Sequence, residues 1–194
     1  MAKMTDIMQP SVEQLEAELE RVRYKKRYGT VLRSTIYTLI TVAAVAVLVA
    51  TLWLPVLQIY GSSMAPTMQN GDIVFSVKTT ELARGEIIAF YYNNKILVKR
   101  VIGCAGDWVD LDPDGTVYVN NEAIAEPYLA EKAYGDTNIE LPYQVPDGRL
   151  FVMGDCRGTS VDSRNAAVGC IAQEQIVGRI IFRVWPMKKL GPIG

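Results

Sequence analysis

A serine and a lysine are the side chains best suited to chemistry in this chain. Ser63 lies in the segment Gly61-Ser62-Ser63-Met64-Ala65-Pro66-Thr67, and Lys99 lies in the mostly apolar run 96–102. The 194-residue sequence contains no histidine, which excludes a Ser/His/Asp triad and any histidine-ligated metal site. A serine nucleophile here would therefore need another base, and lysine is a chemically competent one.

The surroundings of Lys99 favour that role. If 96–102 is a strand, the neighbours of Lys99 on the same face are Leu97 and Val101, because side chains alternate between the two faces. Apolar surroundings disfavour the charged ammonium and lower the pKa of lysine toward neutrality. Taken alone, Lys99 is better explained as a side chain that keeps its stem on apolar surface while its amine reaches water. Turns rich in small polar residues, like that of Ser63, are likewise common without function.

Composition limits the other possibilities. A hydrophobic share of 49% is enough for a packed core, and a net charge of −1 argues against nucleic acid as the main partner, which would need clustered positive charge. Cys104, Cys156 and Cys170 are too few for a disulfide scaffold and lack the C-x-x-C spacing of zinc or redox sites. Three unpaired thiols, or one Cys156–Cys170 disulfide, are the alternatives.

The N-terminal third predicts a membrane anchor, which we place at residues 34–57. No charged residue occurs from Ser34 to Gly71, and a helix over residues 36–57 would be roughly 33 Å long, enough to cross a bilayer. The alternative, a cleavable secretory signal, usually has a shorter apolar region. Six basic residues lie within 13 positions before the span: Arg21, Arg23, Lys25, Lys26, Arg27 and Arg33. This excess of positive charge before the span predicts that residues 1–33 are cytoplasmic and that the chain after the span is extracytoplasmic. Within the cytoplasmic segment we expect a short helix near the N-terminus, capped by Ser11 and Gln14.

Residues 58–194 predict a mainly β, antiparallel domain. Short apolar or alternating runs, typical of strands, cover residues 73–77, 86–91, 96–102, 108–112, 116–119, 150–153 and 176–184. Asn93-Asn94 and Asn120-Asn121 supply the positive backbone angles that tight hairpins need. Residues 123–144, with prolines and mixed polarity, are expected to form an insertion between strands.

Five blocks occur in the order seen in one family of enzymes: residues 63–67, 71–74, 84–88, 99–107 and 154–164, the last containing Gly154-Asp155-Cys156-Arg157 and Ser160-Val161-Asp162-Ser163-Arg164. With the predicted anchor before them, nearly the whole chain resembles type I signal peptidases, the membrane-bound Ser/Lys proteases that remove signal peptides from exported preproteins. The resemblance implies an antiparallel β-sheet catalytic domain behind one transmembrane helix.

The resemblance also implies roles for individual residues. Ser63 would be the nucleophile and Lys99 the general base, Ser160 would orient the lysine amine, and Asp162 and Arg164 would form a supporting ion pair. Substrates would bind extended and be cut after Ala-x-Ala-like sites, and neither a metal nor another cofactor would be needed. The residues expected at the pocket for the small side chain before the cut are Ile59, Met64, Met68, Leu97 and Val98.

Departures from the family pattern concern the loops. Gly61 stands where the Gram-negative branch has a serine that completes the oxyanion hole, and glycine is usual in the Gram-positive-type branch. The Ser63 amide is therefore one expected oxyanion donor, and the second donor stays open. Cys156 replaces a common asparagine.

Two other functions remain as alternatives. A self-cleaving Ser/Lys repressor would share the dyad but should carry a DNA-binding domain instead of a membrane span, and a noncatalytic anchored β-domain would not need to keep both Ser63 and Lys99. Preproteins and membrane lipid are thus the expected partners. Substrate range, oligomeric state and the role of the N-terminal helix are not evident from the sequence.

Overall fold

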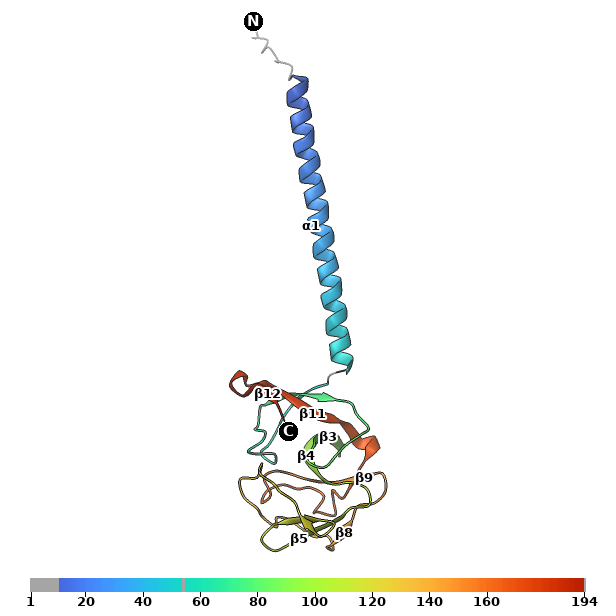
Figure 1. The fold of residues 1–194 in the computed structure, drawn as a ribbon, viewed down its shortest axis with the longest axis vertical. Coiled ribbons are helices and arrows are strands. Elements are labelled where there is room, and N and C mark those ends of the chain that lie inside the picture. The colour runs from blue at the N-terminus through green and yellow to red at the C-terminus, as the bar shows by residue number, and fades with distance from the viewer. Residues whose placement is uncertain (1–10, 54, 194) are drawn as a thin grey trace. The chain divides into compact units, whose positions relative to one another are not determined.

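The computed structural model describes residues 11–53 and 55–193 (Figure 1). The chain divides into a helical unit, Met1–Ala50, and a β-rich unit, Thr51–Gly194. The helix and strands are α1 (Val12–Trp53), β1 (Val56–Gln58), β2 (Ile73–Val77), β3 (Ile87–Tyr92), β4 (Lys95–Gly103), β5 (Trp108–Leu111), β6 (Val117–Val119), β7 (Glu122–Ala123), β8 (Tyr143–Gln144), β9 (Arg149–Met153), β10 (Ile171–Ala172), β11 (Ile176–Trp185) and β12 (Gly191–Pro192). Two single 3₁₀ turns, η1 (Gln173–Gln175) and η2 (Met187–Lys189), flank β11.

Helix α1 begins with the cap that the sequence predicts. The Gln14 amide donates to Ser11 Oγ at 3.3 Å, and the Ser11 amide donates to Gln14 Oε1 at 3.2 Å. These reciprocal bonds satisfy two backbone donors that the first turn would otherwise leave open. The helix then runs without a break for 42 residues, so the short helix and the anchor that we expected separately are one element.

The composition of α1 suits a lipid environment. The helix is long and apolar enough to cross a membrane. Leu39, Ile40 and Val47 expose 58–64% of their surface. Threonine hydroxyls in this region donate to the carbonyl four residues earlier, as Thr38 does to Ser34 at 2.9 Å, and such internal bonds remove the need for water. One N-terminal apolar helix is therefore consistent with a membrane anchor.

The helix ends earlier than the boundary that we placed at residue 57. Its last residue is Trp53, and Val56–Gln58 instead pairs antiparallel with β2, with Leu57 opposite Val74. Pro55 gives a physical reason for this end, because proline has no amide to donate and disfavours a helical residue before it. Two residues assigned by composition to the anchor, Val56 and Leu57, thus belong to the sheet.

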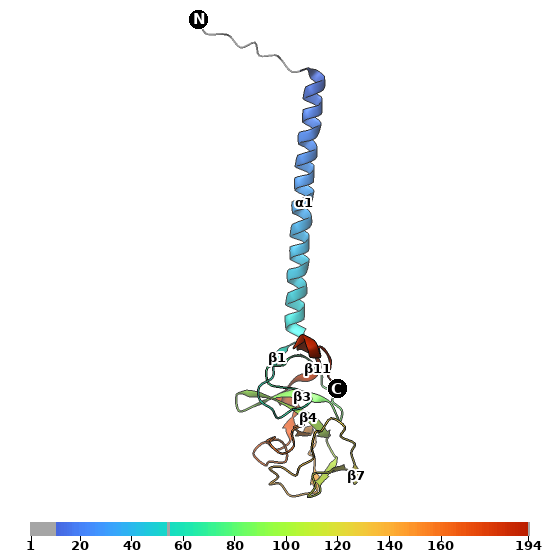
Figure 2. The same ribbon diagram turned by 90° about the vertical axis from the view of Figure 1, so that its left-hand side faces the viewer.

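The β-rich unit is antiparallel, as the sequence predicts, and it contains two sheets. The larger has the strand order β1-β2-β11-β3-β4-β9-β10, with β12 also paired to β11, and the smaller has the order β7-β6-β5-β8. In both views the smaller sheet lies at the opposite end of this unit from β11 (Figure 1, Figure 2). Val109 and Val117 of the smaller sheet pack with Phe151 and Met153 of β9 in one buried cluster, so the two sheets share a core.

The predicted strands and hairpins are confirmed with small shifts at their ends. Asn93 and Asn94, with φ of 45° and 58°, form the two-residue turn between Tyr92 and Lys95, and Asn120 and Asn121 do the same between β6 and β7. Asparagine tolerates this left-handed conformation better than most residues. The strands that sequence reasoning missed are β1 and four two-residue strands: β7, β8, β10 and β12. The expected insertion holds no helix or strand between β7 and β8, within residues 124–142.

Candidate active site

Ser63 lies in a loop that is closed at its base. Strand β1 leads into residues 60–70, here called the serine loop, and the chain then returns to β2. The Ile59 amide donates to the Asp72 carbonyl at 2.8 Å, and the Gly71 amide donates to the Ile59 carbonyl at 2.9 Å. Gly61 has a φ of +91°, which favours glycine, and its amide donates to Asn70 Oδ1 at 3.0 Å. These bonds hold the loop in one conformation.

Two methionines of the serine loop pack against the larger sheet. Met64 and Met68 are 2% and 0% exposed, and both pack in a cluster with Ile87 and Ala89 of β3. Ser63 itself is half-exposed, and its backbone amide donates to no group in the described parts of the chain. The loop therefore presents a hydroxyl and a free N–H from one rigid position, as a nucleophile with an oxyanion donor requires.

Lys99 is buried in β4, as its pattern predicts. The residue is 3% exposed, and Val101 on the same strand face is fully buried. Burial lowers the pKa of Lys99 to about 8. The nearby Asp162 carboxylate opposes this shift and the Arg164 guanidinium adds to it. The neutral amine that a general base requires is therefore populated near neutral pH.

Ser63, Lys99 and Ser160 converge on Gly154. Arg100 pairs with Met153 and Val101 with Val152, so extending this antiparallel register by one residue places Gly154 beside Lys99. A side chain at Gly154 would lie 2.5 Å from the Ser63 carbonyl oxygen and closer still to Ser160 Oγ. Only glycine fits there. Three residues that are distant in sequence are thus gathered around one backbone position.

Ser160 is the least satisfied polar group at this point. It is 2% exposed, and its Oγ lies near the Asp162 carboxylate, where it helps to lower the pKa of that group, but it makes no hydrogen bond of ordinary geometry within the described residues. An unpaired buried hydroxyl costs about 1–3 kcal/mol, and such groups in native proteins call for an explanation. A hydroxyl kept for the amine of Lys99 would provide one.

The predicted ion pair is present and fully buried. Arg164 donates from Nε and Nη2 to the two oxygens of Asp162, both at 2.9 Å, and the Gly154 amide donates to Asp162 Oδ2 at 3.0 Å. Burial alone would raise the pKa of Asp162, but the Arg164 guanidinium and the Gly154 amide hold this pKa below its usual value. The carboxylate therefore stays charged and fixes the position of Gly154.

A second buried ion pair joins the serine loop to β4. Arg100 donates from Nε at 3.0 Å and from Nη2 at 2.8 Å to Asp155, and the Thr67 hydroxyl also donates to Asp155. The Arg100 guanidinium lies 3.8 Å from the centre of the Tyr128 ring. Arg100 is 2% exposed, so these contacts hold its guanidinium inside the protein. This pair keeps the loop and the base strand together.

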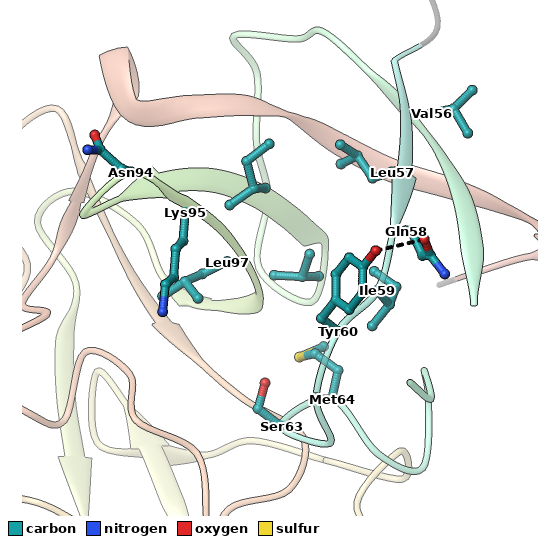
Figure 3. A pocket seen from close by; sticks show the side chains of 13 residues that line it. Val56, Leu57, Gln58, Ile59, Tyr60, Ser63, Met64, Asn94, Lys95 and Leu97 are labelled. Carbon is teal, nitrogen blue, oxygen red and sulfur yellow. Dashed lines mark hydrogen bonds between the residues drawn. The ribbon is translucent and has the colours of Figure 1, made fainter. Parts of the chain in front are cut away.

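Ser63 stands at the edge of a cavity of about 700 Å³ (Figure 3). Ser63 and Met64 reach it from the serine loop and Lys95 and Leu97 from β4, with the Ser63 hydroxyl directed inward. Of the five predicted substrate-binding residues, the four that line the cavity are Ile59, Met64, Leu97 and Val98. Met68 is fully buried and does not line it.

Sequence reasoning missed a part of the cavity wall. The further lining residues are Val56, Leu57, Gln58, Tyr60, Gly61, Asn94, Lys95 and Ile96. Several come from β1, which we had read as the end of the anchor. Along the other wall, β4 pairs with β3 from Lys95 onward but with β9 only from Arg100 onward. On the side of β4 away from β3, the residues before Arg100 therefore have no strand partner among the residues described. The apolar pattern of the sequence could not predict this unpaired edge.

All three cysteines are free thiols. Cys170 is buried, whereas Cys104 and Cys156 are half-buried. The disulfide between Cys156 and Cys170 that we considered is thus not formed. The Cys156 amide donates to the Ser63 carbonyl at 3.0 Å, so Cys156 contacts the serine loop through its backbone.

Comparison with known proteins bears directly on this arrangement. Residues 32–185 match the family described as "Signal peptidase, peptidase S26". The chain belongs to the S26 family of signal peptidases. It is 39% identical over 143 residues to signal peptidase I T of Bacillus subtilis, a match that covers 67% of this chain and 73% of the relative. It is 38% identical over 151 residues to signal peptidase IB of Staphylococcus aureus, with coverages of 68% and 78%.

A solved structure is also similar to this chain. A signal peptidase I from Enterococcus faecalis V583 is 32% identical and aligns with a TM-score of 0.44, covering 50% of this chain and 95% of that one. Membership of the S26 family makes the chain a serine peptidase that removes signal peptides. The matched region includes the serine loop, β4 and the Gly154–Arg164 segment. The family resemblance stated from the sequence is therefore confirmed, and the two sheets of the β-rich unit confirm the antiparallel β-sheet domain that it implied.

Proposed function

We propose that Ser63 is the nucleophile of this signal peptidase and Lys99 its general base. The observation that carries the proposal is the burial of Lys99, with its pKa lowered to about 8, at the point where Ser63 and Ser160 meet around Gly154. Ser160 then positions the lysine amine, and the Asp162–Arg164 pair supports Gly154. The Ser63 amide serves as one oxyanion donor.

The reaction follows from these positions. Neutral Lys99 takes the proton of the Ser63 hydroxyl, and the alkoxide attacks the carbonyl carbon of the scissile bond. The Ser63 amide stabilises the resulting oxyanion. The Lys99 ammonium then gives its proton to the leaving amine, and an ester joins Ser63 to the signal peptide. Water activated by Lys99 hydrolyses that ester and restores the enzyme.

We further propose that the 700 Å³ cavity binds the signal peptide before the cut. The unpaired edge of β4 can accept an extended peptide as an added strand. Ile59, Met64, Leu97 and Val98 would bound a shallow apolar pocket, which admits alanine and excludes larger side chains on steric grounds. This arrangement supports cleavage after Ala-x-Ala-like sites.

For location, we propose a single-pass membrane protein with residues 1–33 in the cytoplasm and the β-rich unit outside. The excess of lysine and arginine before residue 34 supports this orientation. Protease added to the outside of spheroplasts should degrade the β-rich unit and spare the N-terminal segment. Protection of the β-rich unit would contradict the orientation.

The dyad is tested by preprotein cleavage in detergent. Ser63→Ala and Lys99→Ala should each lose at least ~10³-fold in kcat/KM, whereas Lys188→Ala, which removes an exposed lysine, should match the wild type. Retention of the wild-type fold is checked by circular dichroism. A folded Ser63→Ala or Lys99→Ala variant that still processes the preprotein would refute the assignment.

A further inference from the structure

A second cavity lies beside the serine loop. Its volume is about 410 Å³, and it is lined by Ala65 and Pro66 of the loop, by residues 155–159 and by Ala130, Glu131 and Ala133 of the insertion. None of these residues lines the first cavity. The two cavities are therefore separate, and the chain passes from the wall of one to the wall of the other between Met64 and Ala65.

Ser63 connects them. Its side chain lines the first cavity, and its carbonyl accepts a hydrogen bond from the amide of Cys156, which lines the second, at 3.0 Å. An extended peptide advances about 3.3–3.6 Å per residue. If the residues before the cut occupy the first cavity, those just after it must leave Ser63 in another direction, and the second cavity begins within two residues of Ser63.

The charges in this cavity are unequal. Asp155 and Arg157 are buried and neutralised, the first by Arg100 and the second by Glu126. Glu131 is exposed and makes no ion pair with any described residue. Its carboxylate is thus the one uncompensated charge on the described wall, and it would repel an acidic side chain placed in the cavity.

We propose that the second cavity receives the first residues of the mature protein, on the leaving side of the cut, and that Glu131 disfavours acidic side chains there. This inference rests on the proposed role of Ser63 as the nucleophile. It adds a second specificity site to the enzyme. The first cavity would bind the signal peptide residues before the cut, and this one would bind the mature-protein residues after it.

Cys156 offers a native probe for the location, since its half-buried thiol lines the cavity and lies 3.1 Å from Thr159 Oγ1. We would use the full chain in detergent with Ser63→Ala, Cys104→Ala and Cys170→Ala. The preproteins would carry one cysteine activated as a thionitrobenzoate disulfide at mature position 1, 2, 3 or 12. The Cys156 thiolate attacks the activated disulfide, a new S–S bond joins enzyme to preprotein, and thionitrobenzoate leaves.

Cysteines at positions 1–3 should form this adduct at least ~10-fold faster than the one at position 12, because residue 12 of an extended chain lies ~40 Å away. A Cys156→Ser variant should form no adduct. Equal rates at all four positions, or a fastest reaction with a cysteine inside the signal peptide, would overturn the proposal. Failure of the Ser63 assignment is seen separately, as preprotein cleavage by the Ser63→Ala enzyme.

The role of Glu131 is tested by turnover. With wild-type cysteines, preproteins with lysine, alanine or glutamate at mature position 2 are compared by kcat/KM. The wild type should prefer lysine over glutamate by about fivefold, as expected for a partly exposed charge pair, and Glu131→Lys should reverse the order. Glu140→Gln, a change to an exposed carboxylate of the same insertion that lines no part of the cavity, should keep the wild-type ratio. An unchanged ratio in Glu131→Lys would overturn the selectivity.

Discussion

Lys99 is the residue on which the chemistry that we propose for this site depends. Its value as a base comes from burial, which lowers its pKa to about 8, while Asp162 and Arg164 act on it in opposite directions. The charge balance around it therefore matters less than the exclusion of water. Burying a lysine in this environment lowers the free energy of unfolding. The pH dependence of kcat/KM should therefore show the catalytic effect of the burial, and the stability of a Lys99 variant should show its cost.

The first prediction concerns pH. If Lys99 must be neutral to accept the Ser63 proton, kcat/KM should rise about tenfold per pH unit below the pKa and level off above it, because the neutral fraction grows in that way. The midpoint is expected near pH 8. Initial rates of preprotein cleavage between pH 5.5 and 9.5 measure this. A rate that is constant across that range, in enzyme shown to stay folded, would count against Lys99 as the base.

The second prediction concerns stability. Folding lowers the Lys99 pKa from 10.5 to about 8, so below pH 8 the folded state carries the full cost, about 3 kcal/mol. Lys99→Met, with similar volume and no charge, should be inactive yet raise the free energy of unfolding at pH 7 by an amount of this order. The gain should shrink as the pH rises toward 10.5, since the cost disappears once the unfolded lysine is also neutral.

Urea denaturation of both proteins at pH 7 and pH 10 gives the comparison. Lys95→Met serves as the control for stability, because Lys95 is exposed on the same strand and removing its charge should have little effect. A Lys99→Met protein that is less stable than wild type at pH 7 would show that the ammonium is well solvated or well paired in the folded state.

At the scale of elements, the site depends on how closely β9, β4 and the serine loop approach one another. Gly154 extends β9 beside Lys99, and the Ser63 carbonyl and Ser160 Oγ fill the place of its missing side chain. Asp155 and Cys156, which follow directly, bind Arg100 and the Ser63 carbonyl. Gly154 thus allows β9, β4 and the serine loop to approach closely, and the contacts of Asp155 and Cys156 maintain that approach.

Gly154→Ala should therefore reduce activity strongly. Its Cβ would lie 2.5 Å from the Ser63 carbonyl oxygen, so the loop must shift, and a displacement near 1 Å can cost about 10²-fold in rate. Gly29→Ala is the matched control, because its Cβ meets nothing within 4 Å and alanine favours a helix. Cleavage assays on both variants give the test, and a Gly154→Ala enzyme with wild-type kcat/KM would disprove the close approach.

The elements also show what the sequence could and could not predict. Strands such as 73–77 and 176–184 alternate or are strongly apolar, and paired asparagines mark two hairpins, so local patterns were sufficient. Strand β1 was missed because Val56 and Leu57 continue the apolar composition of the anchor, and only their pairing with Phe75 and Val74 reveals a strand. Two-residue strands such as β10 depend on long-range pairing and carry no local signal.

The same distinction applies to the site. Ser63, Lys99, Ser160, Asp162 and Arg164 could be chosen from ordered motifs, and the pattern of β4 predicted the burial of Lys99. The role of Gly154 could not be predicted, since it depends on three segments packing at one point. Met68 was expected at the pocket, but its side chain is fully buried and does not line the cavity. Neither the free edge of β4 nor the second cavity is visible without tertiary structure.

At the scale of the whole molecule, α1 and the β-rich unit have different roles. The β-rich unit contains both cavities and every residue proposed for catalysis, whereas α1 supplies an apolar stretch long enough to cross a membrane. Substrates of a signal peptidase carry an apolar signal sequence of their own. Confining enzyme and substrate to one membrane raises their effective concentration without any additional contact between them.

Removing residues 1–53 should therefore leave the rate of the chemical step unchanged and lower only the rate at which the enzyme meets membrane-bound substrates. Cleavage of a short soluble peptide should stay within about threefold of wild type, while cleavage of a preprotein inserted in lipid vesicles should fall by about 10²-fold, the scale that tethering typically supplies. Replacing residues 34–53 with an unrelated apolar helix should restore vesicle cleavage, because the anchor acts by location. If the replacement fails while peptide cleavage is normal, α1 must make sequence-specific contacts in the membrane, and its role would extend beyond attachment.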